Sequence, residues 1–247
     1  MNSVLRKEYL QALGIDTWVE RQKCRAGAAS RLSAAPQVAA AAPAPALMPA
    51  PLPAGAGTTR EAGIDWPELK ARVAACTRCA LHTTRTQTVF GVGSQQAQWL
   101  IVGEAPGAEE DARGEPFVGR AGQLLNAMLR AVGLAREQVY IANVLKCRPP
   151  GNRDPSATEA GECLPYLEQQ IALLKPKIML AVGRISAQNL LRSDAPLGRL
   201  RQQIHRFGVS QVPLIATYHP AYLLRTPADK RKAWEDLKFA REVCTRV

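Results

Sequence analysis

Apolar residues in the second part of the chain gather alternately in short runs and at helical spacing. Four short apolar runs predict β-strands at residues 99–102, 139–145, 178–182 and 212–217. Helical spacing predicts helices at about residues 124–132, 156–174, 185–191 and 227–243. Strands that alternate with helices are typical of an α/β fold. We therefore predict a three-layer α/β/α domain around a central, mainly parallel four-stranded sheet.

The first 63 residues follow another pattern. Apolar side chains in residues 1–25 lie at roughly helical spacing and predict an amphipathic helix, which either docks onto a protein partner or is marginal without one. From Ala34 to Ala56, 17 of 23 residues are Ala or Pro, a composition that cannot close a core. We therefore predict a disordered Ala/Pro-rich tether at 26–63 and a folded domain at 64–247.

Composition and charge narrow the classes of function. The 247 residues include 32 Lys and Arg against 21 Asp and Glu, and the net charge of +11 favours a polyanionic partner. An apolar run of about 18 residues that could span a membrane is missing, and charges near the N-terminus argue against a signal peptide. We expect a cytoplasmic monomer whose six cysteines are ligands or free thiols.

Four of the cysteines are spaced like the ligands of a metal site. Cys76 and Cys79 form a C-x2-C pair, and Cys147 and Cys163 follow much later in the chain. A C-x2-C turn directs two thiolates at one ion, and two distant cysteines complete a four-sulfur site. The spacing does not distinguish zinc from an iron–sulfur cluster. A reduced thiol pair with two buried cysteines is the alternative.

Three polar segments follow predicted strands, where ligands bind in parallel α/β sheets. Residues 103–119 read GEAPGAEEDARGEPFVG, a turn followed by Phe117, which either stacks on a planar ligand or belongs to the core. Residues 143–155 read NVLKCRPPGNRDP. Asn143 in this segment can bond the amide edge of a ring, and Arg148 and Arg153 flank a loop that either approaches phosphates or is merely solvated.

The third segment, residues 219–225, reads HPAYLLR. His219, held by the Pro that follows it, is a candidate acid or electrostatic group. The apolar pair and the charge that end the segment suit intrusion into a base stack.

Together these segments resemble the uracil-DNA glycosylase superfamily, and specifically its family 4, whose members carry a four-iron–four-sulfur cluster. The motifs occur in that family's order, with the four cysteines at its ligand spacing, from about Trp66 to Val243. Each motif alone is weak, whereas the combination is highly specific. The resemblance implies an enzyme that flips uracil out of single- or double-stranded DNA, hydrolyses its N-glycosidic bond and so starts base excision repair.

The resemblance also implies a role for each motif residue. His219 would stabilise the negative charge on uracil O2 as the base leaves, with Phe117 stacked on the uracil and Asn143 bonded to its polar edge. The turn near the attacked sugar carbon would comprise Glu104, Ala105, Gly107 and Glu110. The DNA would be contacted by Leu223, Leu224 and Arg225 in the gap left by the flipped nucleotide, and by Arg148 and Arg153. A structural 4Fe-4S cluster would be held by Cys76, Cys79, Cys147 and Cys163.

One position departs from some relatives, which orient the attacking water with an Asp where this chain has Ala105. Glu104, Asn152 or backbone carbonyls are the alternatives for that role, so Glu104 and Asn152 join His219 as candidate catalytic residues. Relatives that trap uracil sites covalently carry an additional His in a basic insertion after the second motif, which this chain lacks. We therefore expect a monofunctional enzyme without a lyase step.

A second hypothesis comes from another class of protein. A non-catalytic iron–sulfur module would bind DNA and recruit a polymerase through the helix at 1–25. Ala105 and the tethered helix favour this hypothesis. An inactive wild-type protein would support it, whereas loss of activity in His219→Ala with DNA binding retained would support the enzyme.

Overall fold

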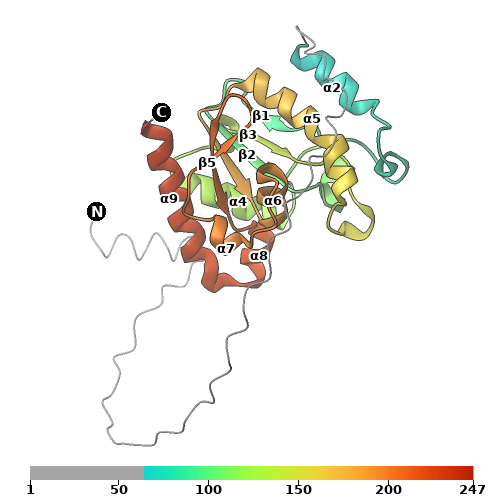
Figure 1. Cartoon of the computed structure of the whole chain (residues 1–247). Helices are drawn as coiled ribbons and strands as arrows, with labels where there is room; N and C mark the ends of the chain where they lie inside the picture. Colours follow the sequence, from blue (N-terminus) through green and yellow to red (C-terminus); the bar gives the residue numbers. More distant parts are fainter. Residues whose placement is uncertain (1–63, 247) are drawn as a thin grey trace, which may run out of the picture. The chain divides into compact units, whose positions relative to one another are not determined.

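The computed structural model describes residues 64–246 of the chain (Figure 1). The helix predicted at 1–25 and the tether predicted at 26–63 lie outside the described residues, so both stay predictions. Within the described part, every helix is too short or too polar to cross a membrane.

A six-stranded sheet in the order β1-β3-β2-β4-β6-β5 forms the centre of the domain. Its inner strands are parallel and correspond to the four predicted runs: β2 (Trp99–Gly103), β3 (Tyr140–Asn143), β4 (Ile178–Val182) and β6 (Val212–Thr217). The edge strands β1 (Val92–Gly93) and β5 (His205–Phe207) are antiparallel and correct the predicted count of four. With two and three residues, they are too short to show an alternating pattern in the sequence.

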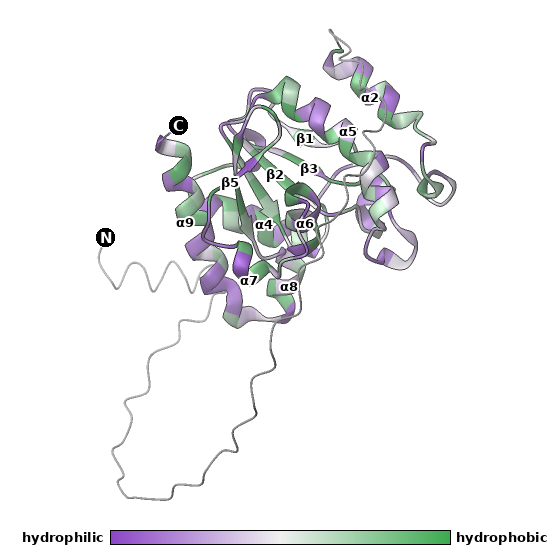
Figure 2. Ribbon diagram, viewed as in Figure 1, coloured by the Kyte–Doolittle hydropathy of each residue, from purple (hydrophilic) through white to green (hydrophobic). Residues whose placement is uncertain are grey.

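Helices cover both faces of the sheet, as predicted for three layers. One face is covered by α5 (Ala157–Leu174), α6 (Arg184–Leu191) and α7 (Leu197–Leu200), and the other by α4 (Arg120–Ala131) and α9 (Lys230–Arg246). Successive residues of β2 alternate between the two cores, so all five are buried. Figure 2 shows the inner strands mostly in green, whereas the helices alternate between green and purple along their ribbons.

The start and end of α5 follow from local sequence signals. Ser156 Oγ accepts a hydrogen bond from Glu159 N at 3.2 Å, and Glu159 Oε2 accepts one from Ser156 N at 2.8 Å. The helix ends at Lys175, whose left-handed backbone precedes Pro176. The last predicted helix, at 227–243, is divided into a 3-10 turn, η4 (Pro227–Asp229), and α9.

The remaining helical elements are short and flank the loops that carry the polar motifs. They are α2 (Trp66–Ala74), η1 (Ala80–Thr83), α3 (Ala108–Arg113), η2 (Arg136–Gln138), η3 (Pro150–Asn152) and α8 (Pro220–Arg225). Helix α2 lies beside α5 in Figure 1 and packs on it through a separate small core around Leu69, Val73 and Phe90. This contact brings the C-x2-C segment that follows α2 towards α5.

Candidate active site

The carboxyl ends of the parallel strands border a cavity of about 420 Å³. Strands β2 and β3 end at Gly103 and Asn143, and His219 follows β6, so the three polar motifs meet there. The cavity is lined by ten residues that the sequence singled out: Glu104, Ala105, Gly107, Glu110, Phe117, Asn143, Asn152, Arg153, His219 and Arg225.

Phe117 forms one wall of the cavity from a conformation that non-glycine residues rarely adopt, with φ of +54°. Arg136 holds this conformation from outside the motif. Its Nη1 donates to the carbonyl oxygen of Phe117 at 3.3 Å, and its Nη2 donates to that of Pro116 at 2.6 Å. Because Gly122 packs directly against the Phe117 carbonyl, a side chain there would displace the loop.

Glu110 fixes the other end of the same loop. Its Oε1 accepts hydrogen bonds from the backbone N–H groups of Val118 and Gly119 at 3.0 and 3.3 Å, and its Oε2 accepts one from Gly107 at 3.1 Å. Glu110 was predicted as a substrate contact. It lines the cavity, but both carboxylate oxygens bond the backbone, so its evident role is to position the loop.

Asn143 ends β3 and is 2% exposed. Gly103 is its partner on β2, and a Cβ there would collide with Asn143 Oδ1 and the Phe117 ring. Within residues 64–246, the amide of Asn143 has no protein hydrogen-bond partner. A buried amide that borders a cavity without a partner is suited to bond a ligand.

His219 caps the N-terminus of α8 and stacks on Phe117, with ring centroids 5.6 Å apart and ring planes 29° apart. Its Nδ1 accepts a hydrogen bond from Ala221 N at 3.1 Å. Burial, and to a lesser extent the positive charge of Arg225, lower the pKa of His219 to about 4. At neutral pH the imidazole is therefore neutral, and because Nδ1 is an acceptor, its proton lies on Nε2, which can donate to a ligand.

Glu104 directly follows β2. Burial raises the pKa of Glu104 to about 7, the negative charge of Asp154 also raises it, and the positive charge of Arg184 lowers it. A carboxylate with this pKa suits a general base near neutral pH. Asn152, the other candidate for holding water, is already engaged, because its Oδ1 accepts a hydrogen bond from Arg148 Nε at 2.8 Å.

The residues predicted to contact DNA differ in exposure and in their protein partners. Leu223 is 1% exposed, so it is a core residue here, whereas its neighbour Leu224 is 37% exposed. Arg153 donates two hydrogen bonds to Glu159, at 2.6 and 2.8 Å, which offset the charge expected to face phosphates. Without DNA, Leu224 thus offers the exposed apolar side chain and Arg153 is an ion-pair partner, and the DNA contacts of Leu223 and Arg153 stay predictions.

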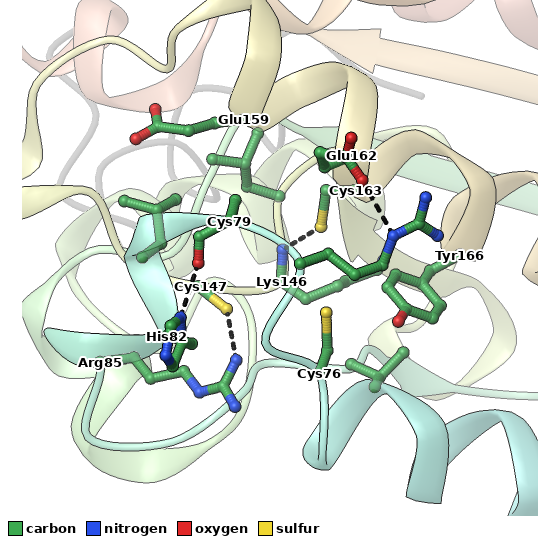
Figure 3. A pocket seen from close by; sticks show the side chains of 14 residues that line it. Cys76, Cys79, His82, Arg85, Lys146, Cys147, Glu159, Glu162, Cys163 and Tyr166 are labelled. Atoms are coloured by element: carbon green, nitrogen blue, oxygen red, sulfur yellow. Dashed lines mark hydrogen bonds and ion pairs between the residues drawn. The ribbon is translucent and has the colours of Figure 1, made fainter. Parts of the chain in front are cut away.

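A second cavity is lined by all four cysteines predicted as metal ligands: Cys76, Cys79, Cys147 and Cys163. They come from the segment after α2, the start of η1, the loop after β3, and α5. Figure 3 shows the sulfur atoms of Cys76, Cys147 and Cys163 around a shared space. In the described range 64–246, no three His, Cys, Asp or Glu side chains are grouped closely enough to hold one metal ion.

The cysteine cavity is lined by cations and N–H donors and also by Glu159 and Glu162. Arg85 Nη1 donates to Cys147 Sγ at 3.0 Å, and the backbone N of Lys146 donates to Cys163 Sγ at 3.2 Å. Burial raises the pKa of the Cys163 thiol to about 11, so without a ligand it is protonated. These donors would stabilise sulfur atoms that carry negative charge.

Three charged residues near the active site were not predicted. Asp154 belongs to the second motif and follows the candidates Asn152 and Arg153, so its position in the sequence could have indicated that it lies at the site. Arg184 opens α6 directly after the carboxyl end of β4, a position that strand topology could have flagged. Arg136 lies in η2, and no sequence pattern connects it to the Phe117 loop.

Comparisons with known proteins show the family of this chain. Residues 90–238 match the family described as the uracil DNA glycosylase superfamily. A type-4 uracil-DNA glycosylase of Archaeoglobus fulgidus is 44% identical over 179 residues, which cover 70% of this chain and 89% of the relative. Type-4 enzymes of Pyrobaculum aerophilum and Sulfurisphaera tokodaii are 44% and 40% identical, over 70% and 71% of this chain and 92% and 83% of theirs.

The chain thus belongs to the uracil-DNA glycosylase superfamily. Within that superfamily, it belongs to the type-4 family.

Proposed function

We propose that this protein is a monofunctional uracil-DNA glycosylase, which hydrolyses the bond between uracil N1 and the deoxyribose C1′ and leaves an abasic site. One observation carries the proposal: a neutral His219 with its proton on Nε2 stacks on Phe117 in the cavity that also holds the unpaired amide of Asn143. These groups fit the flat face, the polar edge and the developing charge of a uracil.

The leaving base is the part of the reaction that this site stabilises best. As the N1–C1′ bond breaks, its electron pair moves onto the uracil ring, and the Nε2–H of His219 donates a hydrogen bond to the growing charge on O2. Asn143 bonds the amide edge of the ring with one donor and one acceptor. A preorganised donor of this kind is worth about 10²–10³ in kcat.

Water completes the reaction from the sugar side. Its oxygen bonds to C1′, and its proton passes to the carboxylate of Glu104, whose raised pKa suits proton uptake near neutral pH. Asn152 and Arg148 bond each other across the loop and hold that wall of the cavity. Because water is the nucleophile, no covalent intermediate and no lyase step are required.

The substrate must leave the base stack before this chemistry, at a cost of a few kcal/mol that is smaller for a mismatched G·U pair. Arg225 lines the cavity from α8, and the exposed Leu224 precedes it on that helix; both would occupy the gap left by the nucleotide. The net charge of +11 would attract the phosphates of single- or double-stranded DNA. Bound to this substrate, the enzyme would act in the cytoplasm at the nucleoid.

The cysteine cavity would hold a 4Fe-4S cluster. Four thiols from separate segments line it, and the donors at 3.0 and 3.2 Å and the charges of Arg85 and Lys146 suit a set of anionic sulfurs. When bound, the cluster would cross-link α2, α5 and the loop after β3 and supply no step of the hydrolysis. A protein partner for residues 1–25 and the monomeric state stay predictions.

One anaerobic preparation tests the function. A uracil-containing oligonucleotide is incubated with the wild type and His219→Ala, and alkali then cleaves any abasic sites. We expect cleavage by the wild type and about 10²–10³-fold slower cleavage by the variant, with DNA binding retained. His205→Ala, which lies outside both cavities, is the control. An inactive wild type that binds DNA would favour the non-catalytic module.

The same preparation tests the cluster. Broad absorbance near roughly 400 nm, with iron and sulfide in equal amounts, would support it. A colourless, active protein would overturn the cluster and leave the glycosylase in place.

A further inference from the structure

Three charged residues, from two strand ends and one loop, lie at or next to the active-site cavity. Glu104 follows β2, Arg184 follows β4 as the first residue of α6, and Asp154 lies in the loop after η3. Strands β2 and β4 are neighbours in the sheet, which places Glu104 and Arg184 at adjacent strand ends. Asp154 lines the same cavity as Glu104.

Asp154 and Arg184 form an ion pair, with Arg184 Nη2 3.0 Å from Asp154 Oδ2. Arg184 is oriented by a second hydrogen bond, from its Nη1 to Gln188 Oε1 at 3.2 Å on the next turn of α6. The two side chains are 53% and 63% exposed, so the pair adds little to stability. Its position beside a catalytic carboxylate therefore calls for another explanation.

We propose that Asp154 and Arg184 are positioning residues that act through Glu104 and set the pH range in which the enzyme works. The inference rests on the proposed function, in which Glu104 takes the proton of the attacking water. Asp154 opposes the ionised form of Glu104, and Arg184 favours it, so the ion pair balances two opposite effects on one group.

The other charged or titratable groups at the cavity are committed elsewhere. Arg153 is bonded to Glu159, and Glu110 is bonded to three backbone N–H groups. His219 is neutral around pH 7. Arg225 acts on His219 rather than on Glu104. Asp154 and Arg184 are thus the two charges that can tune Glu104.

The test is the pH profile of kcat/KM on one uracil oligonucleotide, measured from pH 5 to 9. The wild-type profile should fall below about pH 7, where Glu104 becomes protonated. In Asp154→Asn this fall should move to lower pH by on the order of half a unit, and in Arg184→Gln to higher pH by a similar amount. The double variant should lie close to the wild type.

Two exposed residues outside the cavity provide matched controls. Asp194→Asn and Arg199→Gln remove the same charges and should leave the profile in place. Thermal unfolding of Asp154→Asn and Arg184→Gln should match the wild type, which separates tuning from a folding defect.

Opposite shifts of the two single variants support the inference. Profiles that coincide with the wild type would overturn it, provided that Glu104→Gln abolishes the fall near pH 7. If Glu104→Gln keeps that fall, the titrating group is another residue, and the inference fails together with the role of Glu104. An inactive wild type would instead contradict the proposed function itself.

Discussion

The two cavities of this protein are built in opposite ways, although the segment after β3 supplies both. The active-site cavity lies where parallel strands end. Among the described residues, the Asn143 amide there has no protein partner, whereas Glu110 is held by backbone N–H groups and Asn152 by Arg148. The cysteine cavity joins segments far apart in sequence, and two of its sulfurs already accept hydrogen bonds. In the proposed function, the first cavity would receive a substrate that is exchanged at each turnover, and the second would hold a resident cluster.

Lys146 connects the two cavities. It is 1% exposed, and its Nζ donates to the carbonyl oxygen of Asn143 at 2.9 Å and to Gln170 Oε1 at 2.6 Å. Its backbone N donates to Cys163 Sγ. Because one buried residue bonds both sides, a structural metal site can keep the end of β3 in place without taking part in the chemistry. The comparison therefore predicts that the two cavities fail differently when mutated.

The largest effect is expected from Cys163→Ser. Loss of one ligand should release the bound metal and lower the free energy of unfolding by on the order of 4 kcal/mol, since structural metal loss is among the most destabilising changes. The folded fraction should still cleave uracil. Iron content, denaturant unfolding and activity per folded molecule are the measurements.

Cys244→Ser is the control for this change, because Cys244 is also buried but lies on α9, outside the cysteine cavity. It should keep the metal. A Cys163→Ser protein that is stable yet inactive would contradict the view that the cysteine cavity stabilises the fold and takes no part in the reaction.

Gly103→Ala should damage the active-site cavity alone. The added methyl group would collide with Asn143 Oδ1 and the Phe117 ring, so both groups must move. A displacement of about 1 Å costs roughly 100-fold in rate. Steady-state kinetics should show this loss with the absorbance of the metal site unchanged. Gly161→Ala, on α5 with open space around its added Cβ, should leave activity intact.

Glu104→Gln should separate activity from stability. A carboxylate whose folded pKa of about 7 exceeds its ordinary 4.5 contributes stability below pH 4.5 that is lost as the pH rises through 7. The variant should therefore be more stable than the wild type at pH 8, by about 1–2 kcal/mol after solvent screening, and alike at pH 4. Its cleavage rate should also fall by about 10²–10⁴-fold, which leaves a residual rate that can be measured. Chemical denaturation at both pH values measures the free energy of unfolding. Equal stability of variant and wild type at pH 8 would contradict the argument that the buried, ionised Glu104 is unfavourable.

The sequence predicted those parts of the fold that depend on a regular apolar pattern or on a short local motif. The four inner strands are continuous apolar runs because helices cover both faces, and α5 begins at a capping box, so both are visible in the chain. Most site residues were found because the polar motifs directly follow these strands. The two-residue β1 and the three-residue β5 were missed, since pairing at a sheet edge leaves no pattern of its own.

Contacts between distant segments were beyond prediction where no motif marks the residues involved. Nothing in the sequence around Arg136 indicates that it holds the carbonyls of Pro116 and Phe117. Likewise, Leu223 and Leu224 are identical in type and adjacent, and only the packing of α8 decides which one is buried. The choice between neighbouring residues of one kind is made by tertiary structure.

The smallest expected effect concerns these two leucines. Leu224→Ala should slow cleavage of uracil in duplex DNA about fivefold, roughly 1 kcal/mol, because less apolar surface fills the gap in the stack. Single-stranded substrate, which needs no such filling, should be cleaved at the wild-type rate, and the melting temperature should not change. Leu223→Ala should instead lower the melting temperature, because it leaves a buried cavity. If Leu223→Ala alone slows the duplex reaction at unchanged stability, the buried leucine must move out on DNA binding.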